Sequence, residues 1–105
     1  MYDECIAFVE LVDTGEKDEF GDKILSEEKE DAFAEMKSIG MKEFYQAQTV
    51  GKKPEIVFEI PDYEDYKGQQ LVDYEDTRYK VLRTYRKGNA LEITCYGGVR
   101  KDAGT

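Results

Sequence analysis

The feature that most limits how this chain can fold is a series of short apolar runs that end in turn-forming residues. In the clearest run, residues 55–60, Ile56, Phe58 and Ile60 share one side and two glutamates share the other, as expected for a strand with one buried face. Comparable runs have hairpin spacing, without the strand–helix alternation of parallel sheets. They occupy residues 5–12, 23–26, 32–39, 70–74, 78–85 and 91–96, the last ended by Gly97-Gly98. We predict a mainly β fold, a small antiparallel β-barrel or sandwich of five to six strands with one short helix.

The short helix is predicted over residues 40–48. Met41, Phe44, Tyr45 and Gln48 are spaced i, i+3, i+4 and i+7 and therefore share one helix face. Glu43 lies in the first turn, where the helix dipole favours a carboxylate. Because the helix is so short, packing against the rest of the chain must hold it.

The first predicted strand is apolar on both of its faces. One face carries Cys5, Ala7, Val9 and Leu11, and the other carries Ile6 and Phe8. A strand of an open antiparallel sheet normally has one polar face. Two interpretations remain open at this point: a central strand buried within the chain, or a strand covered on one side by a neighbouring subunit.

Length and cysteine content suggest a single small domain. The 105 residues are enough for one modest core, which we expect over residues 1–98, with a flexible tail over residues 99–105. No apolar run could span a bilayer and no secretory signal pattern is present, so we expect a cytoplasmic protein without membrane contact. Cys5 and Cys95 are expected to be reduced and buried.

The chain is acidic, with 24 acidic and 15 basic side chains and a net charge of −9. Such a charge repels phosphates at long range, so general nucleic-acid binding is not expected. The plain interpretation of the charge is solubility. The alternative is an acidic wall past which DNA slides without adhering.

Recognisable catalytic and metal-binding patterns are not found in the sequence. The chain has no His, which removes the usual general base and the commonest metal ligand. Gly51-Lys52 does not complete a phosphate loop, because Gln46 and Lys53 stand where Gly and Ser or Thr belong. The acidic run 62–68 does not complete a calcium loop, because a tyrosine stands where a third oxygen ligand belongs. We expect no enzymatic activity, no cofactor and no metal.

Two groups of residues permit functional as well as structural interpretations. Lys52 and Lys53 form a basic pair on a loop; they are either simply solvated or, in a ring of copies, able to meet a DNA end. Tyr63, Tyr66 and Tyr85 belong to a tyrosine-rich second half. They suit core or rim packing, a protein interface or a ligand pocket equally well.

From the predicted helix onward, the chain resembles a family of phage proteins. Residues Glu43-Phe44-Tyr45-Gln46-Ala47-Gln48 resemble the Glu-aromatic-Tyr-x-Ala-Gln signature of phage head-closure proteins, also called head–tail joining or stopper proteins. The later segments follow in the family's order: a loop with Pro, the strand 56–60, a polar loop, the strand 71–74, a turn, and Arg78-Tyr79-Lys80-Val81. The resemblance covers residues 33–96, and residues 75–77 lack the Gly that many members have in this turn.

The resemblance implies a structural role in virion assembly. Members of the family form a ring beneath the portal and its adaptor in long-tailed phages, close the channel after DNA packaging, and then provide the docking surface for the tail. The implied partners are further copies of the chain, the adaptor–portal complex, the tail terminator and, transiently, packaged DNA. The implied location is the host cytoplasm during assembly and then the head–tail connector of the virion.

The resemblance also implies roles for particular residues. The channel and gating role falls on a loop made of Gln48, Thr49, Val50, Gly51, Lys52, Lys53 and Pro54, with Lys52 and Lys53 as contacts for the DNA end. Subunit contacts fall on the first strand and on residues 13–26. The interface residues expected there are Ile6, Phe8 and Phe20.

Two other functions remain open from the sequence. A tail-terminator or tail-completion protein would share the ring habit but bind the tail tube first. A small β-barrel module could instead bind a peptide or sugar as a monomer, in a pocket lined by Tyr63, Tyr66 and Tyr85.

Overall fold

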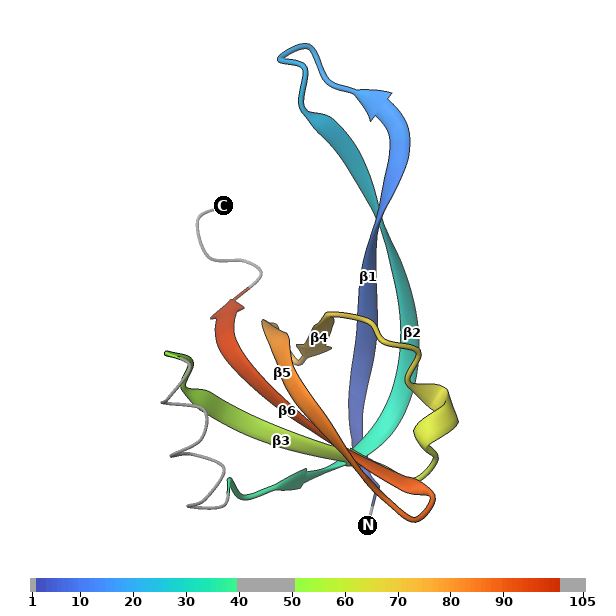
Figure 1. The fold of residues 1–105 in the computed structure, drawn as a ribbon, viewed down its shortest axis with the longest axis vertical. Helices are drawn as coiled ribbons and strands as arrows, with labels where there is room; N and C mark the ends of the chain where they lie inside the picture. The colour runs from blue at the N-terminus through green and yellow to red at the C-terminus, as the bar shows by residue number, and fades with distance from the viewer. Residues whose placement is uncertain (1, 40–50, 101–105) are drawn as a thin grey trace.

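A computed structural model describes residues 2–39 and 51–100 of the chain (Figure 1). The described residues form antiparallel strands and one short 3-10 helix, so the fold is mainly β, as predicted. The elements in chain order are β1 (Glu4–Lys17), β2 (Lys23–Lys37), β3 (Pro54–Ile60), the 3-10 helix η1 (Tyr63–Asp65), β4 (Leu71–Tyr74), β5 (Thr77–Lys87) and β6 (Ala90–Arg100).

The six strands close into a barrel in the order β1-β2-β3-β6-β5-β4. Tight hairpins join β4 to β5 and β5 to β6, whereas β3 pairs with β6, its partner farther along the chain. The connection from β3 to β4 passes the β5–β6 turn, where the Tyr63 amide donates to the Asn89 carbonyl at 2.7 Å. Closure pairs the strand edges around the ring and so removes the open edges at which sheets aggregate.

The barrel interior is filled by the apolar side chains that alternate along the strands. Its largest fully buried members are Phe8, Phe58, Ile6, Ile60, Ile93, Val72 and Cys95. Phe58 packs edge to face against Tyr74 and Tyr79, with ring centroids 5.2 and 6.3 Å apart. Each such large apolar side chain contributes about 1.5–3 kcal/mol by leaving water, so this layer accounts for much of the stability of the barrel.

The β1–β2 hairpin is much longer than the barrel needs. β4 pairs with β1 only over Ile6–Val9, and β3 pairs with β2 only over Glu35–Lys37. Beyond these contacts the hairpin continues as a two-stranded projection along the long axis of the molecule (Figure 1), which measures 46 Å. We call residues 11–26 of this projection the arm.

Two strand boundaries differ from the sequence-based prediction. β2 runs without a break through the charged segment 27–31, because pairing with β1 satisfies its backbone while the charged side chains face water. β6 continues through Gly97 and Gly98 to Arg100. The predicted tail is therefore wrong for residues 99 and 100, which pair with β5.

The glycine at position 98 has a steric reason. A Cβ built on Gly98 would lie 2.6 Å from a ring carbon of Tyr79 and 3.0 Å from the Thr77 methyl group. A side chain at this position could fit only if the Tyr79 ring and the Thr77 methyl group moved aside. Gly98 therefore lets the two strands stay paired where a strand end was expected.

Two burial predictions are also wrong. Cys5 is exposed, because it lies on the outer face of β1, whereas Cys95 is buried as expected. Glu59 is buried although it was expected to face water. Its carboxylate accepts a hydrogen bond from the Tyr2 hydroxyl at 2.8 Å and lies 3.8 Å from the Lys37 ammonium.

The predicted helix over residues 40–48 lies outside the described residues. Among residues 2–39 and 51–100, no helix has both the length and the apolar character needed to cross a membrane.

Candidate functional site

The structure corrects the predicted subunit interface on the first strand. Ile6 and Phe8 are 1% and 0% exposed and belong to the core cluster of the barrel. They cannot contact a second subunit while the barrel is closed, so the prediction is wrong for both. Phe20, the third predicted interface residue, lies at the tip of the arm and is 81% exposed.

The structure describes only part of the predicted gating loop. Gln48, Thr49 and Val50 lie outside the described residues, as does the family-motif helix with Glu43, Phe44, Tyr45, Ala47 and Gln48. The described part of the loop is Gly51, Lys52, Lys53 and Pro54.

The described loop residues differ in their surroundings. Gly51, Lys52 and Lys53 are exposed, and the Lys52 ammonium lies 5.0 Å from the centre of the Tyr96 ring. Pro54 is buried and is the first residue of β3, where it pairs with Tyr96. Assigning Pro54 to a loop is therefore wrong, because it is fixed in the sheet.

The three tyrosines proposed for a ligand pocket have other roles. The Tyr66 ring packs edge to face on the core residue Phe8, and its hydroxyl donates to the Gln69 carbonyl. The Arg86 guanidinium lies 3.6 Å from the centre of the Tyr63 ring. Tyr85 is exposed on β5. Tyr63 and Tyr66 are thus engaged in packing and do not form a cleft with Tyr85.

The tip of the arm is an ordered turn that holds Phe20 outward. The Asp18 carboxylate accepts the backbone amides of Phe20 at 2.9 Å and of Asp22 at 3.0 Å. The Gly21 amide donates to the Asp18 carbonyl, and Gly21 has the positive φ of 84° that completes the turn. These bonds fix the backbone on both sides of the exposed ring.

The arm combines apolar side chains with acidic charge. Besides Phe20, the large apolar residues Leu11, Ile24 and Leu25 are exposed. The arm carries five acidic residues, Asp13, Glu16, Asp18, Glu19 and Asp22, against the two basic residues Lys17 and Lys23. Its net charge is therefore −3, and among the described residues no strand other than β1 and β2 pairs with it.

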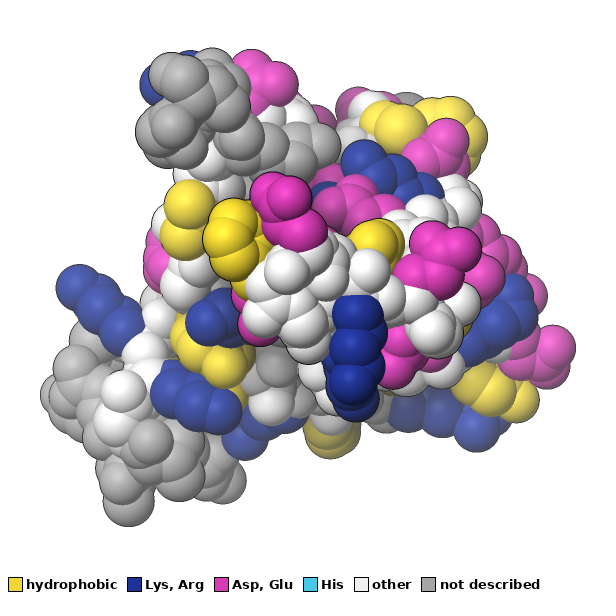
Figure 2. Space-filling view, turned by 90° about the horizontal axis from the view of Figure 1, so that it is seen from above, with side chains coloured by type: hydrophobic (Ala, Val, Ile, Leu, Met, Phe, Trp, Pro, Cys, Tyr) yellow, Lys and Arg dark blue, Asp and Glu magenta, His cyan; other side chains and the backbone are white. Residues whose placement is uncertain are grey.

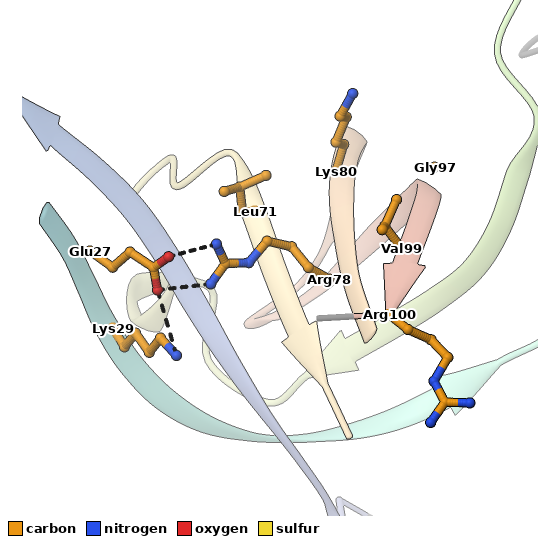
Figure 3. A pocket seen from close by; sticks show the side chains of 8 residues that line it. All are labelled: Glu27, Lys29, Leu71, Arg78, Lys80, Gly97, Val99 and Arg100. Atoms are coloured by element: carbon orange, nitrogen blue, oxygen red, sulfur yellow. Dashed lines mark hydrogen bonds and ion pairs between the residues drawn. The ribbon is translucent and has the colours of Figure 1, made fainter. Parts of the chain in front are cut away.

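A hollow of about 480 Å³ opens beside the base of the arm. Its lining residues are Glu27, Lys29, Leu71, Arg78, Lys80, Gly97, Val99 and Arg100. In Figure 3 the ion-paired Glu27, Lys29 and Arg78 lie on one side, and Lys80, Val99 and Arg100 lie on the other. We call this set of residues the basic hollow.

One wall of the basic hollow is a network of ion pairs centred on Arg78. Its guanidinium donates two hydrogen bonds to Asp73, at 2.7 and 3.0 Å, and two to Glu27, at 2.8 and 2.9 Å. The Lys29 ammonium lies 3.5 Å from Asp73 and 3.7 Å from Glu27. Asp73 is only 6% exposed, so its charge depends on these two cations.

The network changes how its members titrate. Hydrogen bonds from Arg78 lower the pKa of Glu27 below its usual value, with the nearby Lys29 acting in the same direction. Hydrogen bonds to Glu27 and Asp73 raise the pKa of Arg78, which stays protonated throughout. The wall therefore keeps a fixed arrangement of charges at neutral pH.

The charge of the basic hollow is positive overall. Lys29, Arg78, Lys80 and Arg100 supply four positive charges, while Glu27 and the adjoining Asp73 supply two negative ones, which leaves +2. Figure 2, a view from the arm's side, shows Lys and Arg side chains gathered at the lower left and interspersed with Asp and Glu side chains over the rest of this face.

This network was not predicted from the sequence, although the sequence contains a signal for it. Glu27 and Lys29 are two positions apart, as are Arg78 and Lys80, and residues at this spacing share a face of a strand. The same pattern gives no metal site: the structure groups no three potential ligands among residues 2–39 and 51–100. The arrangement is suited to holding a partner of complementary charge.

Comparison with known proteins adds no relative to this description. No family model matches the chain, and no curated protein matches it either.

Proposed function

We propose that the protein is a structural component of a phage head–tail connector. In this role, copies of the chain form a ring that closes the portal channel after DNA packaging and offers a docking surface to the tail. The observation that carries the proposal is the arm, which extends from a closed barrel and presents an 81% exposed Phe20 on an ordered turn. It coincides with residues 13–26, where the sequence resemblance places subunit contacts.

The barrel and the arm suit the two tasks of a ring subunit. A closed barrel offers few open strand edges, so contact between copies must use side chains that extend from it. Exposed apolar side chains on a projecting element are typical of association surfaces. The arm supplies such side chains, and the barrel supplies a rigid body to be positioned.

The charge of the chain fits a channel that DNA must pass. A net charge of −9 limits adhesion of DNA to the body of the protein. Lys52 and Lys53 are exposed and offer local positive charge for a DNA end. The proposal assigns the chain a structural role and no catalytic one, with the host cytoplasm and then the virion connector as its locations.

The proposal is tested by deleting the gene from an inducible phage genome and imaging the lysate by negative-stain electron microscopy. We expect emptied or leaking heads beside intact, unattached tails. Complementation with the wild-type gene should restore infectious particles. Complementation with Phe20→Ser should not, because this variant removes the exposed ring and leaves the barrel untouched.

The matched control is Phe33→Ser, which removes an aromatic ring that is 64% exposed on β2, away from the arm. We expect this variant to restore infectious particles. Normal particles from the deletion itself would contradict the proposal. Filled, closed heads without tails would contradict the closing role in particular.

A further inference from the structure

The arm and the basic hollow are complementary in charge and in shape. The arm has a net charge of −3 and ends in a protruding aromatic ring, as described above. The basic hollow has a net charge of +2 and a volume of about 480 Å³. A hollow in this size range can accept a large side chain. Leu71 and exposed Val99 give it the apolar surface that such a side chain requires.

We propose that the tip of the arm of one copy docks into the basic hollow of a second copy. Phe20 inserts against Leu71 and Val99, and the carboxylates on either side of it, from Glu19 and Asp22, face Lys80 and Arg100. This inference rests on the proposed ring, for which it names the contact between subunits. Its test requires only the purified chain.

The ordered turn at the tip favours this mode of docking. The amides of Phe20 and Asp22 are already bonded to Asp18, so the tip binds without having to order its backbone first. Ordering a loop on binding costs affinity, and a preformed turn avoids that cost.

The arm cannot fill the hollow of its own chain. The tip lies at the far end of the long axis, whereas β4, β5 and β6, which line the hollow, belong to the barrel (Figure 1). The contact must therefore join two copies through different surfaces, a donor tip and an acceptor hollow. Contacts of this kind repeat from copy to copy and close into a ring if the rotation permits, or otherwise form a filament.

The decisive experiment exchanges the charges of the two surfaces. One variant carries Glu19→Lys and Asp22→Lys on the arm, and another carries Lys80→Glu and Arg100→Glu in the hollow. Sedimentation velocity should show association of the wild type that weakens with salt. Each variant alone should have a dissociation constant at least about tenfold higher, because like charges then meet.

Mixing the two variants should restore association. In the mixture, the basic arm of the first variant meets the acidic hollow of the second, and the acidic arm of the second meets the basic hollow of the first. A general loss of folding could not be repaired in this way. Circular dichroism and thermal unfolding of each variant provide the check that the barrel is intact.

A second pair of variants tests the aromatic ring. Phe20→Ser should weaken association at least about tenfold, whereas Phe33→Ser, the matched control on β2, should leave it unchanged. Equal losses in both variants would overturn the proposal, as would a mixture of the charge variants that fails to associate. A wild-type chain that remains monomeric up to its solubility limit would also overturn it.

These outcomes are separable from those of the proposed function. If gene deletion empties the heads but the charge exchange fails, the ring is held by another contact and only this inference is lost. If the charge exchange succeeds but deletion leaves normal phage, the contact exists and the connector role is wrong.

Discussion

Replacing Arg78 by Met should destabilise the protein far more than the same change at a neighbouring cation. The substitution removes four hydrogen bonds from the guanidinium, two of them to Asp73. Asp73 is 6% exposed and would lose both of its hydrogen bonds from the guanidinium, while the Lys29 ammonium stays at 3.5 Å. A buried carboxylate that loses its main partner is costly, because it can neither regain water nor share its charge.

The size of the effect can be worked out separately for the pair with Asp73 and the pair with Glu27. Breaking a buried pair costs about 3–5 kcal/mol. The half with Glu27, which is 41% exposed, contributes less than about 1 kcal/mol, and Lys29 compensates part of the loss at Asp73. We expect a loss of about 2–4 kcal/mol for Arg78→Met, or a fall in Tm of about 10–25 °C for a domain of this size.

Urea unfolding at a concentration where the chain is monomeric measures the effect, with Lys80→Met as matched control. Lys80 lies two positions along β5 and is exposed, so its loss should change stability by no more than about 0.5 kcal/mol. The double variant Asp73→Asn/Arg78→Met should be more stable than Arg78→Met alone, because it removes the stranded charge. Equal losses at the two cations, or a further loss on adding Asp73→Asn, would refute the reasoning.

Three further outcomes can be checked independently. Because the pKa of Glu27 is lowered in the folded protein, its ionised carboxylate stabilises the fold above the usual Glu pKa of about 4.3. This stabilisation is lost as the pH falls through the lower folded pKa, so acidification should reduce the free energy of unfolding of Glu27→Gln less than that of the wild type. Gly98→Ala should lose about 1–3 kcal/mol in urea unfolding, since its Cβ would meet the Tyr79 ring at 2.6 Å; full stability would show that β5 yields freely. A thiol reagent should label exposed Cys5 rapidly in the native protein, whereas Cys95, whose pKa burial raises to about 12, should react only after unfolding; fast labelling of both would contradict the closed barrel.

The strands were predictable where a local pattern controls the structure. Residues 55–60 alternate in polarity and end at Pro61, so both the strand and its boundary follow from chemistry that the sequence displays. The exception within this run is Glu59. It is buried because Tyr2 and Lys37, which are distant in sequence, cover it. Alternation predicts which side a residue faces, but it does not predict what will cover that side.

The length of the β1–β2 hairpin was not predictable from local pattern. The acidic segment 27–31 resembles a loop in composition, yet its backbone bonds to β1 throughout. The register even places Glu10 directly opposite Glu28, a like-charge pair that disfavours pairing locally. Pairing persists because the flanking positions on both strands hold the hairpin together. Such a balance depends on the whole hairpin, which no short window of sequence contains.

The basic hollow illustrates the same limit for a site. Spacing indicates that Arg78 and Lys80 share a face of β5 and that Glu27 and Lys29 share a face of β2. The β4–β5 register places Asp73 opposite Arg78, and barrel closure brings β2 within reach of the guanidinium. Both the register and the closure depend on the tertiary structure, which the spacing of residues in one strand does not show. The exposed position of Phe20, by contrast, could be predicted from the sequence. A phenylalanine among Asp, Glu and Gly residues has no apolar neighbours in the chain with which to be buried.

The arm is most readily understood as an element kept for contact with another protein. A two-stranded hairpin without a covered face is at best marginally stable in water, and extending it beyond the barrel adds ordering cost with little apolar burial to offset it. The Asp18 turn, the Lys23–Asp13 ion pair at 3.6 Å and the Thr14 hydroxyl bond to the Ile24 carbonyl at 2.7 Å all stiffen it without burying it. Stiffness brings no gain to an isolated barrel. It does bring a gain to a tip that must reach a neighbour in a defined direction.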